Sequence, residues 1–211
     1  MPELPEVEVV KRSLNNKAQN SIIKSIKIND GRLRYKIDKN QIKNIIGLRL
    51  QKILRRSKFL LFFFSKGIVM LIHLGMTGKL FFINKKNTKY KTSFYYDLNE
   101  EKDNKHDRVI FSLSQGQKIV YNDVRKFGFI KIILIKDIEK NIHLKILGPE
   151  PLKNSFNFVY FKNYISSSGI IASTSISITI SGLANPFTIK PVEQTLIPFK
   201  CLPITLYTSS R

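Results

Sequence analysis

The sequence predicts a mainly β protein: a two-sheet antiparallel β-sandwich with an N-terminal helix and further flanking helices, followed by an atypical tail. Three observations predict this class. Apolar residues recur at helical spacing near the start of the chain, many short segments then alternate apolar and polar positions, and turn residues separate these segments. One helix, a series of short antiparallel strands and a second helix pack most simply as two sheets flanked by helices.

The first predicted element is a helix that begins near Pro5. Proline suits the first helical turn, and Leu4, Val7, Val10 and Leu14 recur at the spacing of one helix face. Acidic residues in the same segment complement a helix N-terminus. This helix would anchor a chain end that would otherwise fray.

The strands are predicted from alternating or continuous apolar residues between turn residues. The segments expected to form them are 22–28, 48–54, 59–64, 68–74, 79–83, 109–113, 119–121 and 129–135. A meander through 59–64, 68–74 and 79–83 is the simplest arrangement. Residues 84–105 are polar and without period, which predicts a long mobile loop. Asp137 is the expected N-cap of a short helix that reaches Leu147.

The net charge predicts a polyanionic partner. The chain has 36 Lys and Arg against 15 Asp and Glu, a formal charge of +21 and a pI near 10.1. Nucleic acid is the first candidate, and an anionic membrane surface is the second. No secretory signal is apparent, and the apolar runs fall short of the ~20 residues of a transmembrane helix. We expect a soluble cytoplasmic monomer without a membrane partner, associated with the nucleoid if the source is bacterial.

The charge is unevenly distributed along the chain. Residues 1–163 hold 33 basic and 14 acidic residues, whereas residues 164–211 hold three and one. We expect a β-sandwich domain at 1–147, a linker at 148–163 and a divergent or truncated tail at 164–211, for which the sequence leaves open whether it folds. The single cysteine, Cys201, excludes an intrachain disulfide and a four-cysteine zinc site, so no metal or cofactor is predicted.

The first eight residues, Met-Pro-Glu-Leu-Pro-Glu-Val-Glu, contain a candidate nucleophile. Removal of Met1, which a small second residue permits, exposes the secondary amine of Pro2. An α-amino group has a pKa of about 7.7 to 8.0, so part of it is unprotonated at neutral pH. Such an amine can attack a sugar C1′ and form a Schiff base, with Glu3 beside it as an acid or base. The alternative interpretation is a helix start without catalysis.

This N-terminal string resembles the signature of the formamidopyrimidine-DNA glycosylase family, base-excision repair enzymes related to endonuclease VIII. The resemblance implies a β-sandwich domain and a bifunctional DNA glycosylase and abasic-site lyase. Pro2 would displace an oxidised purine such as 8-oxoguanine or a formamidopyrimidine, and the imine would collapse by strand-cleaving elimination. The resemblance also places the family's elimination lysine on Lys58, after Arg55-Arg56-Ser57. On its residues alone, this segment could equally be a basic strand end that grips phosphate.

Three further segments are similar to family motifs that contact DNA. In His73-Leu74-Gly75-Met76-Thr77-Gly78, Met76 would fill the void left by a flipped-out base. In the segment 122–128, Arg125 would face the orphaned base and Phe127 would wedge into the stack. His106 matches a DNA-contacting histidine of the family. The alternatives are a surface bend with a buried Phe127 and an ordinary polar loop at His106. The implied partner is double-stranded DNA containing oxidised bases or abasic sites.

The resemblance covers residues 1–163 and includes the segment 147–152, similar to the point where the family's linker leaves the first domain. The family's helix-two-turn-helix domain and zinc finger are not recognisable after it, as if the tail were a shifted reading frame or an unrelated replacement. Because these parts supply many phosphate contacts, we expect weakened DNA binding and reduced or absent activity. The rival interpretations are a catalytically impaired DNA-binding remnant and a non-enzymatic basic nucleic-acid-binding domain.

Overall fold

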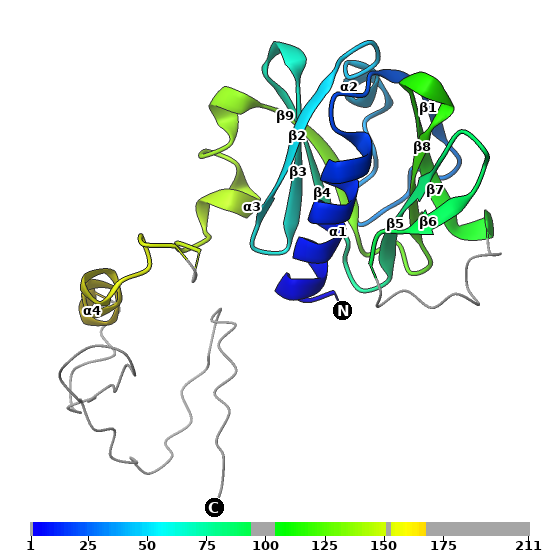
Figure 1. The fold of residues 1–211 in the computed structure, drawn as a ribbon. Helices are drawn as coiled ribbons and strands as arrows, with labels where there is room; N and C mark the ends of the chain where they lie inside the picture. The colour runs from blue at the N-terminus through cyan, green and yellow to red at the C-terminus, as the bar shows by residue number, and fades with distance from the viewer. Residues whose placement is uncertain (1, 94–103, 151–152, 168–211) are drawn as a thin grey trace, which may run out of the picture. The chain divides into compact units, whose positions relative to one another are not determined.

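Two antiparallel sheets form the core of the computed structural model, which describes residues 2–93, 104–150 and 153–167 (Figure 1). The five-stranded sheet has the order β1 (Ile23–Ile28), β7 (Asp107–Leu113), β8 (Lys118–Asp123), β5 (Gly78–Ile83) and β6 (Lys89–Lys91). The four-stranded sheet has the order β2 (Leu50–Arg56), β3 (Phe59–Phe64), β4 (Ile68–His73) and β9 (Phe129–Leu134). The predicted two-sheet sandwich with an N-terminal helix is confirmed.

The N-terminal helix α1 (Leu4–Ala18) begins with a capping box between Glu3 and Glu6. The backbone N–H of Glu3 donates to the Glu6 carboxylate at 3.0 Å, which satisfies a donor that the helix itself leaves unpaired. The apolar face predicted from the sequence is buried, and the helix packs mainly on β2. These contacts hold the start of the chain at one end of the sandwich (Figure 1).

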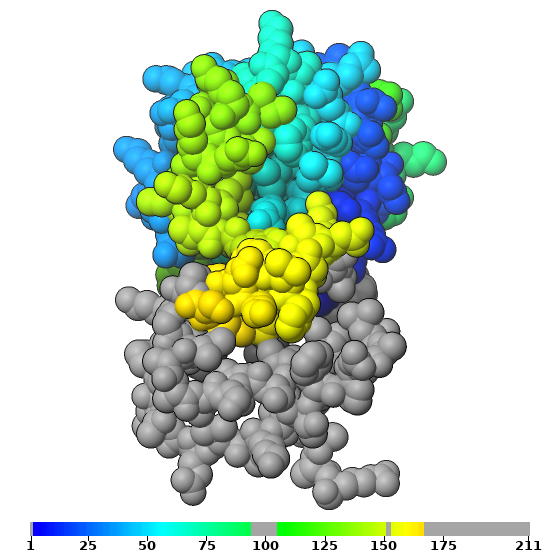
Figure 2. Space-filling model, turned by 90° about the vertical axis from the view of Figure 1, so that its left-hand side faces the viewer, coloured from blue at the N-terminus to red at the C-terminus, as the bar shows by residue number. Residues whose placement is uncertain are grey.

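The continuous apolar run of β3 is explained by burial of both faces of its sheet. Leu60, Phe62 and Phe64 belong to the main core between the two sheets. Leu61 and Phe63 point the other way, into a second apolar cluster that includes Leu144 of the short helix α3 (Ile142–Lys145). The segment that carries α3, yellow-green in Figure 2, covers this outer face of the four-stranded sheet. A strand buried on both faces reads as an unbroken apolar run.

The predicted meander is wrong at β5. β3 and β4 pair as expected, but the turn between Gly75 and Gly78 carries the chain into the other sheet, where β5 pairs with β8 and β6. Gly75 adopts a φ of +64°, which an L side chain rarely adopts. The glycine-bounded turn therefore redirects the chain across the sandwich instead of closing a hairpin.

The predicted loop at 84–105 contains regular structure. β6 lies within it and forms a hairpin with β5, while residues 94–103 lie outside the described residues. The remainder of the loop prediction, its mobility, stays a prediction.

Two details of the helices also differ from expectation. Asp137 ends a 3₁₀ turn, and the N-cap of α3 is Asn141, whose side chain accepts from the backbone N–H of His143 at 3.0 Å. The chain turns between these two positions, so Asp137 is too early to cap the helix. α2 (Lys39–Lys43) spans five residues, too few for apolar periodicity to predict it.

The described residues divide into two compact units, with the boundary between Lys153 and Asn154. The second unit contains α4 (Phe158–Ser167), while residues 168–211, most of the predicted tail, lie outside the described residues. The boundaries expected at 147 and 163 stay predictions. Within the part of the chain that the structure describes, no helix is long and apolar enough to cross a bilayer.

Candidate active site

The seven predicted site residues lie at one end of the sandwich. The register that pairs Phe59 with His73 places the β2–β3 turn beside the turn after β4. The register that pairs Gly78 with Asp123 places the latter turn beside the segment after β8. An ion pair joins the start of α1 to the same end. The residues brought to this end are Pro2, Glu3, Lys58, Met76, His106, Arg125 and Phe127.

The three residues predicted to be catalytic are close together. Lys58 Nζ lies 2.6 Å from Glu3 Oε2, with side chains that are 21% and 56% exposed. Pro2 directly precedes Glu3 and is half-buried. An amine and a carboxylate in contact can pass protons to and from a group that reacts beside them. The arrangement can therefore support a nucleophile at Pro2 with proton transfer by its neighbours.

An ion-pair network lies behind Lys58, and sequence reasoning missed it. Arg55 Nε lies 2.9 Å from Glu8 Oε2, and another guanidinium nitrogen of Arg55 lies 2.8 Å from Glu150 Oε2. Burial raises the pKa of Glu8, but hydrogen bonds from Lys11, Arg12 and Arg55 outweigh it and lower that pKa to about 2. Glu8 is therefore ionised at neutral pH and holds α1 against the strand that leads to Lys58.

Glu150 is the second carboxylate of this network, and its side chain is more buried than that of Glu8. It is 8% exposed and accepts from the backbone N–H of Ser57 at 2.6 Å and from Arg56 at 3.1 Å, besides its contact with Arg55. Burial raises the pKa of Glu150, but the hydrogen bonds from the Ser57 N–H and from Arg55 lower it by more. The pKa therefore lies below its ordinary value. The sequence signals only a stiff Pro-Glu-Pro connector, because the partners of Glu150 lie more than ninety residues earlier.

The two turns predicted to contact DNA are joined by a buried carboxylate. Asp123 is fully buried and accepts from the Thr77 hydroxyl at 2.6 Å and from the Gly128 N–H at 2.9 Å. The same hydroxyl accepts from the Arg125 N–H at 3.0 Å. Asp123 thus fixes both turns in one arrangement. Asp123 lies in the segment 122–128, but the sequence alone does not assign it a role.

The tips of these turns expose two apolar side chains and a guanidinium around one pocket. Met76 and Phe127 are 42% and 45% exposed. The Arg125 guanidinium lies 4.7 Å from the centre of the Phe127 ring, a cation–π contact. An open pocket of about 680 Å³ lies between the tips, and its lining includes Leu33, Arg34, His73, Gly75, Met76, Arg125, Lys126 and Phe127. Exposure of Phe127 favours the wedge interpretation over a buried bend.

His106 is tied to the same end through Arg108. The Arg108 guanidinium lies 3.0 Å from His106 Nδ1 and donates to the backbone oxygens of Asp123 and Val124. It also lies 3.5 Å from Asp30, which contacts Lys126 at 2.7 Å. Hydrogen bonds from Arg32 and Lys126 hold the pKa of Asp30 well below its ordinary range. The turn that carries Arg125 and Phe127 is therefore braced from both sides.

His73 supports the turn that carries Met76. Its Nδ1 accepts from the backbone N–H of Gly75 at 3.1 Å, and its ring packs between Phe59 and Phe129. Burial, followed by the charges of Arg34 and Lys58, lowers the pKa of His73 from 6.5 to about 4. The imidazole is neutral at pH 7, as an acceptor of this hydrogen bond must be.

The free energy of unfolding should therefore fall on mild acidification. The pKa of His73 is lower in the folded than in the unfolded chain, so the unfolded chain binds the proton first and stability is lost as pH falls from 6.5 towards about 4. We expect a loss of about 1–2 kcal/mol between pH 7 and pH 5, measured by urea unfolding. His73→Asn, which keeps an acceptor but does not titrate, should flatten this slope; an unchanged slope would contradict the assignment.

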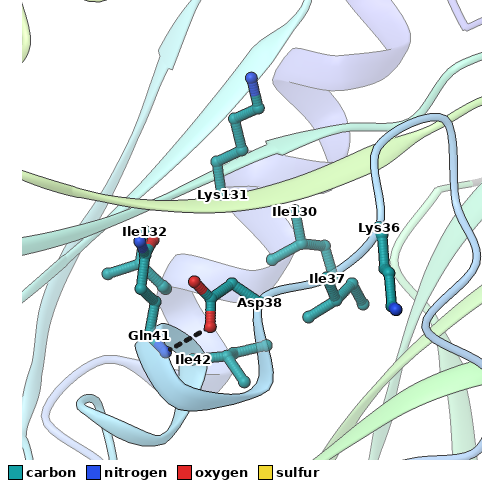
Figure 3. Close-up of a pocket in the computed structure, with 8 residues that line it drawn as sticks. All are labelled: Lys36, Ile37, Asp38, Gln41, Ile42, Ile130, Lys131 and Ile132. Atoms are coloured by element: carbon teal, nitrogen blue, oxygen red, sulfur yellow. Dashed lines mark hydrogen bonds between the residues drawn. The ribbon is translucent and has the colours of Figure 1, made fainter.

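A second pocket contains none of the predicted site residues (Figure 3). It has a volume of about 180 Å³ and lies between α2 and β9. Asp38, which lines this pocket, is the N-cap residue of α2, and its side chain accepts from the backbone N–H of Gln41 at 3.0 Å. The Asp38 carboxylate is therefore already engaged in capping α2. Among the described residues, no group of three His, Cys, Asp or Glu side chains could hold a metal ion.

Comparisons with known proteins point to the same family as the motifs. The family model described as the formamidopyrimidine-DNA glycosylase N-terminal domain matches residues 1–130. A Bradyrhizobium sp. (strain BTAi1) formamidopyrimidine-DNA glycosylase is 42% identical over 157 residues, which cover 74% of this chain and 53% of that protein. Its counterpart from the Wolbachia of Brugia malayi is 38% identical over 79% of this chain and 56% of that protein. The chain thus spans about half the length of these relatives.

Solved structures of the Lactococcus lactis Fpg protein share the fold. A complex with DNA containing an N7-benzyl-Fapy-dG matches with a TM-score of 0.63 and 28% identity over 78% of this chain and 55% of that one. A complex with abasic-site DNA matches with a TM-score of 0.62 and 27% identity over 77% and 55%. The likeness again covers about half of the solved protein.

Proposed function

The chain belongs to the formamidopyrimidine-DNA glycosylase family, and on this basis we propose that it is a base-excision repair DNA glycosylase with abasic-site lyase activity. The proposed substrates are oxidised purines, 8-oxoguanine and formamidopyrimidines, and abasic sites in double-stranded DNA. The observation that carries the proposal is the Lys58–Glu3 contact directly beside Pro2. We assign 1–147 to the catalytic domain, 148–163 to a linker and 164–211 to the tail.

The proposed reaction begins after removal of Met1. The Pro2 nitrogen attacks C1′ of the damaged nucleotide, the glycosidic bond breaks, and the base leaves with the electron pair and takes up a proton. The Pro2 nitrogen gives up its proton, the deoxyribose ring opens as O4′ takes up a proton, and an iminium forms between Pro2 and C1′. Loss of a proton from C2′ then expels the 3′ phosphate, which cleaves the strand. Glu3 and Lys58 are the groups in place to carry these protons.

The DNA contacts follow from the exposed tips at the same end. Met76 would fill the vacancy left by the flipped nucleotide, which restores part of a stacking loss of a few kcal/mol. Arg125 would bond the edge of the orphaned base, and Phe127 would wedge beside it. We assign His106, which is half-buried beside Arg108, to a phosphate contact.

A second candidate is a DNA-binding remnant of the family with impaired catalysis. It is favoured by the formal charge of +21 and by the exposed side chains of Met76 and Phe127, which suit DNA binding whether or not the chain is a catalyst.

Borohydride reduction in the presence of abasic-site DNA tests the proposal. A Schiff base is reduced to a stable covalent adduct, and we expect peptide mass spectrometry to place that adduct on residue 2. No adduct, together with DNA affinity that falls steeply with salt, would support the binding remnant instead. An adduct on a lysine would refute the assignment of the nucleophile.

Replacement of Lys58 should affect elimination more than Schiff-base formation. In Lys58→Gln, Glu3 loses the ammonium group 2.6 Å away, while the amine of Pro2 is untouched. We expect strand cleavage to fall about 100-fold and trapping by less than about tenfold. Rates of product release and of adduct formation, measured on the same abasic-site duplex, check this; an equal fall in both would contradict a role in elimination.

A further inference from the structure

Charged contacts form a closed ring around the start of α1. Lys58 contacts Glu3, the N-cap residue of the helix. Ser57, the residue before Lys58, donates its N–H to Glu150 at 2.6 Å. Glu150 contacts Arg55, and Arg55 contacts Glu8, which lies on α1 itself. The ring therefore links the helix, the β2–β3 turn and the segment that leaves the sandwich after Leu147.

We propose that Glu150 is a positioning residue for Lys58: its carboxylate holds the Ser57–Lys58 turn so that Lys58 Nζ meets Glu3. Glu150 itself does not reach the reacting atoms. The expected effect on strand cleavage rests on the proposed function. The placement of Lys58 can be measured independently of any activity.

Both peptide groups of Ser57 depend on Glu150. The Ser57 N–H donates to Glu150 directly, and the Ser57 carbonyl accepts from Arg55 at 2.9 Å, whose guanidinium Glu150 also holds. Ser57 has a φ of +50°, which a residue with a side chain adopts only when its surroundings enforce it. Loss of the Glu150 carboxylate would remove the contacts that hold Ser57 in this conformation, and Lys58 would move with the turn.

The position of Glu150 is itself fixed by backbone contacts. Arg56 lies 3.1 Å from the carboxylate and donates to the carbonyl oxygens of Leu147 and Gly148. The segment 147–150 is thus bound along its length to the strand that precedes Lys58. Because the carboxylate is only 8% exposed, water cannot easily replace it as the partner of Ser57 and Arg55.

The first measurement is acylation of lysines by an amine-reactive ester, read residue by residue by mass spectrometry on the full chain. In the unmodified protein Lys58 is 21% exposed and paired with Glu3. Glu150→Ala should raise its acylation rate about threefold or more relative to Lys126, a matched internal control that is 34% exposed and paired with Asp30. Glu150→Gln, which keeps an acceptor for Ser57, should give a smaller increase.

The second measurement is the ratio of strand cleavage to borohydride trapping on abasic-site DNA. Glu150→Ala should lower this ratio about tenfold, because outer contacts that orient a reacting group commonly carry effects of this size, and Glu150→Gln should recover part of it. A core variant, Ile42→Val or Ile42→Ala, serves as the control for general destabilisation. The one whose thermal stability matches that of Glu150→Ala is used. It should leave both the ratio and Lys58 acylation unchanged.

The outcomes are distinct for the two proposals. Acylation of Lys58 that stays within about twofold in Glu150→Ala, or that rises equally in the Ile42 variant, overturns the positioning role. If the unmodified chain forms no adduct, the proposed function fails, and the acylation result still decides the role of Glu150.

Discussion

Replacing Pro2 with glutamate is expected to lower covalent trapping on abasic-site DNA by about 100-fold or more. A large residue at position 2 keeps Met1 in place, so the free amine is moved one residue away from Glu3 and Lys58, and the secondary amine is lost. Because the nucleophile forms the covalent bond itself, no neighbouring group can compensate. Gel separation of borohydride-treated mixtures measures the effect, and intact mass confirms the state of the N-terminus.

Pro5→Ala is the matched control for this variant. Pro5 lies in the first turn of α1, where alanine is also well accommodated, and the amine of Pro2 is unchanged. Trapping by this control should stay within about threefold of the unmodified chain. If the glutamate variant at position 2 traps as well as the control, the nucleophile lies elsewhere and the proposed mechanism is wrong.

Gly128→Ala is expected to cost about 3 kcal/mol or more of the free energy of unfolding. A Cβ at this position would stand 1.8 Å from the Tyr121 hydroxyl, 2.5 Å from the His73 carbonyl oxygen and 3.2 Å from the Asp123 carboxylate. The side chain of Tyr121 is fully buried, and the His73 oxygen belongs to a strand, so neither can withdraw cheaply. Urea unfolding monitored by tyrosine fluorescence checks this value.

Two further variants identify the cause of that loss. Gly31→Ala is the control, because its added Cβ would meet only ordinary contacts of 3.5 and 3.7 Å, and it should change stability by less than about 1 kcal/mol. Adding Tyr121→Phe to Gly128→Ala removes the closest clash but not the carbonyl, so it should recover only part of the loss. Wild-type stability in Gly128→Ala would contradict the packing described for the two turns.

The sequence predicts elements well where the physical signal is local. The apolar face of α1 and the apolar run of β3 are both visible in residues a few positions apart, and both elements form as expected. The destination of β5 is not local. Whether the chain after Gly78 returns to β4 or crosses to β8 depends on which sheet offers a free strand edge, and spacing along the chain does not encode that.

The residues of the candidate site also divide into those with a local sequence signal and those whose role arises only from folding. Pro2, Lys58 and Arg125 stand in short strings that resemble family motifs, so they could be found from the sequence. Asp123 and Glu150 could not be assigned in this way, because their roles arise from partners brought close only by folding. A buried carboxylate must have hydrogen-bond donors, but the sequence does not say which donors they are.

The five-stranded sheet ends in two edges of unequal length, and both carry lysine. β6 consists of only three residues, Lys-Tyr-Lys, and β1 presents the exposed side chains of Lys24 and Lys27. An edge strand that is short or charged offers few backbone groups to another copy and repels it at close approach. These edges therefore disfavour edge-to-edge aggregation, a failure to which unprotected sandwiches are prone at high protein concentration.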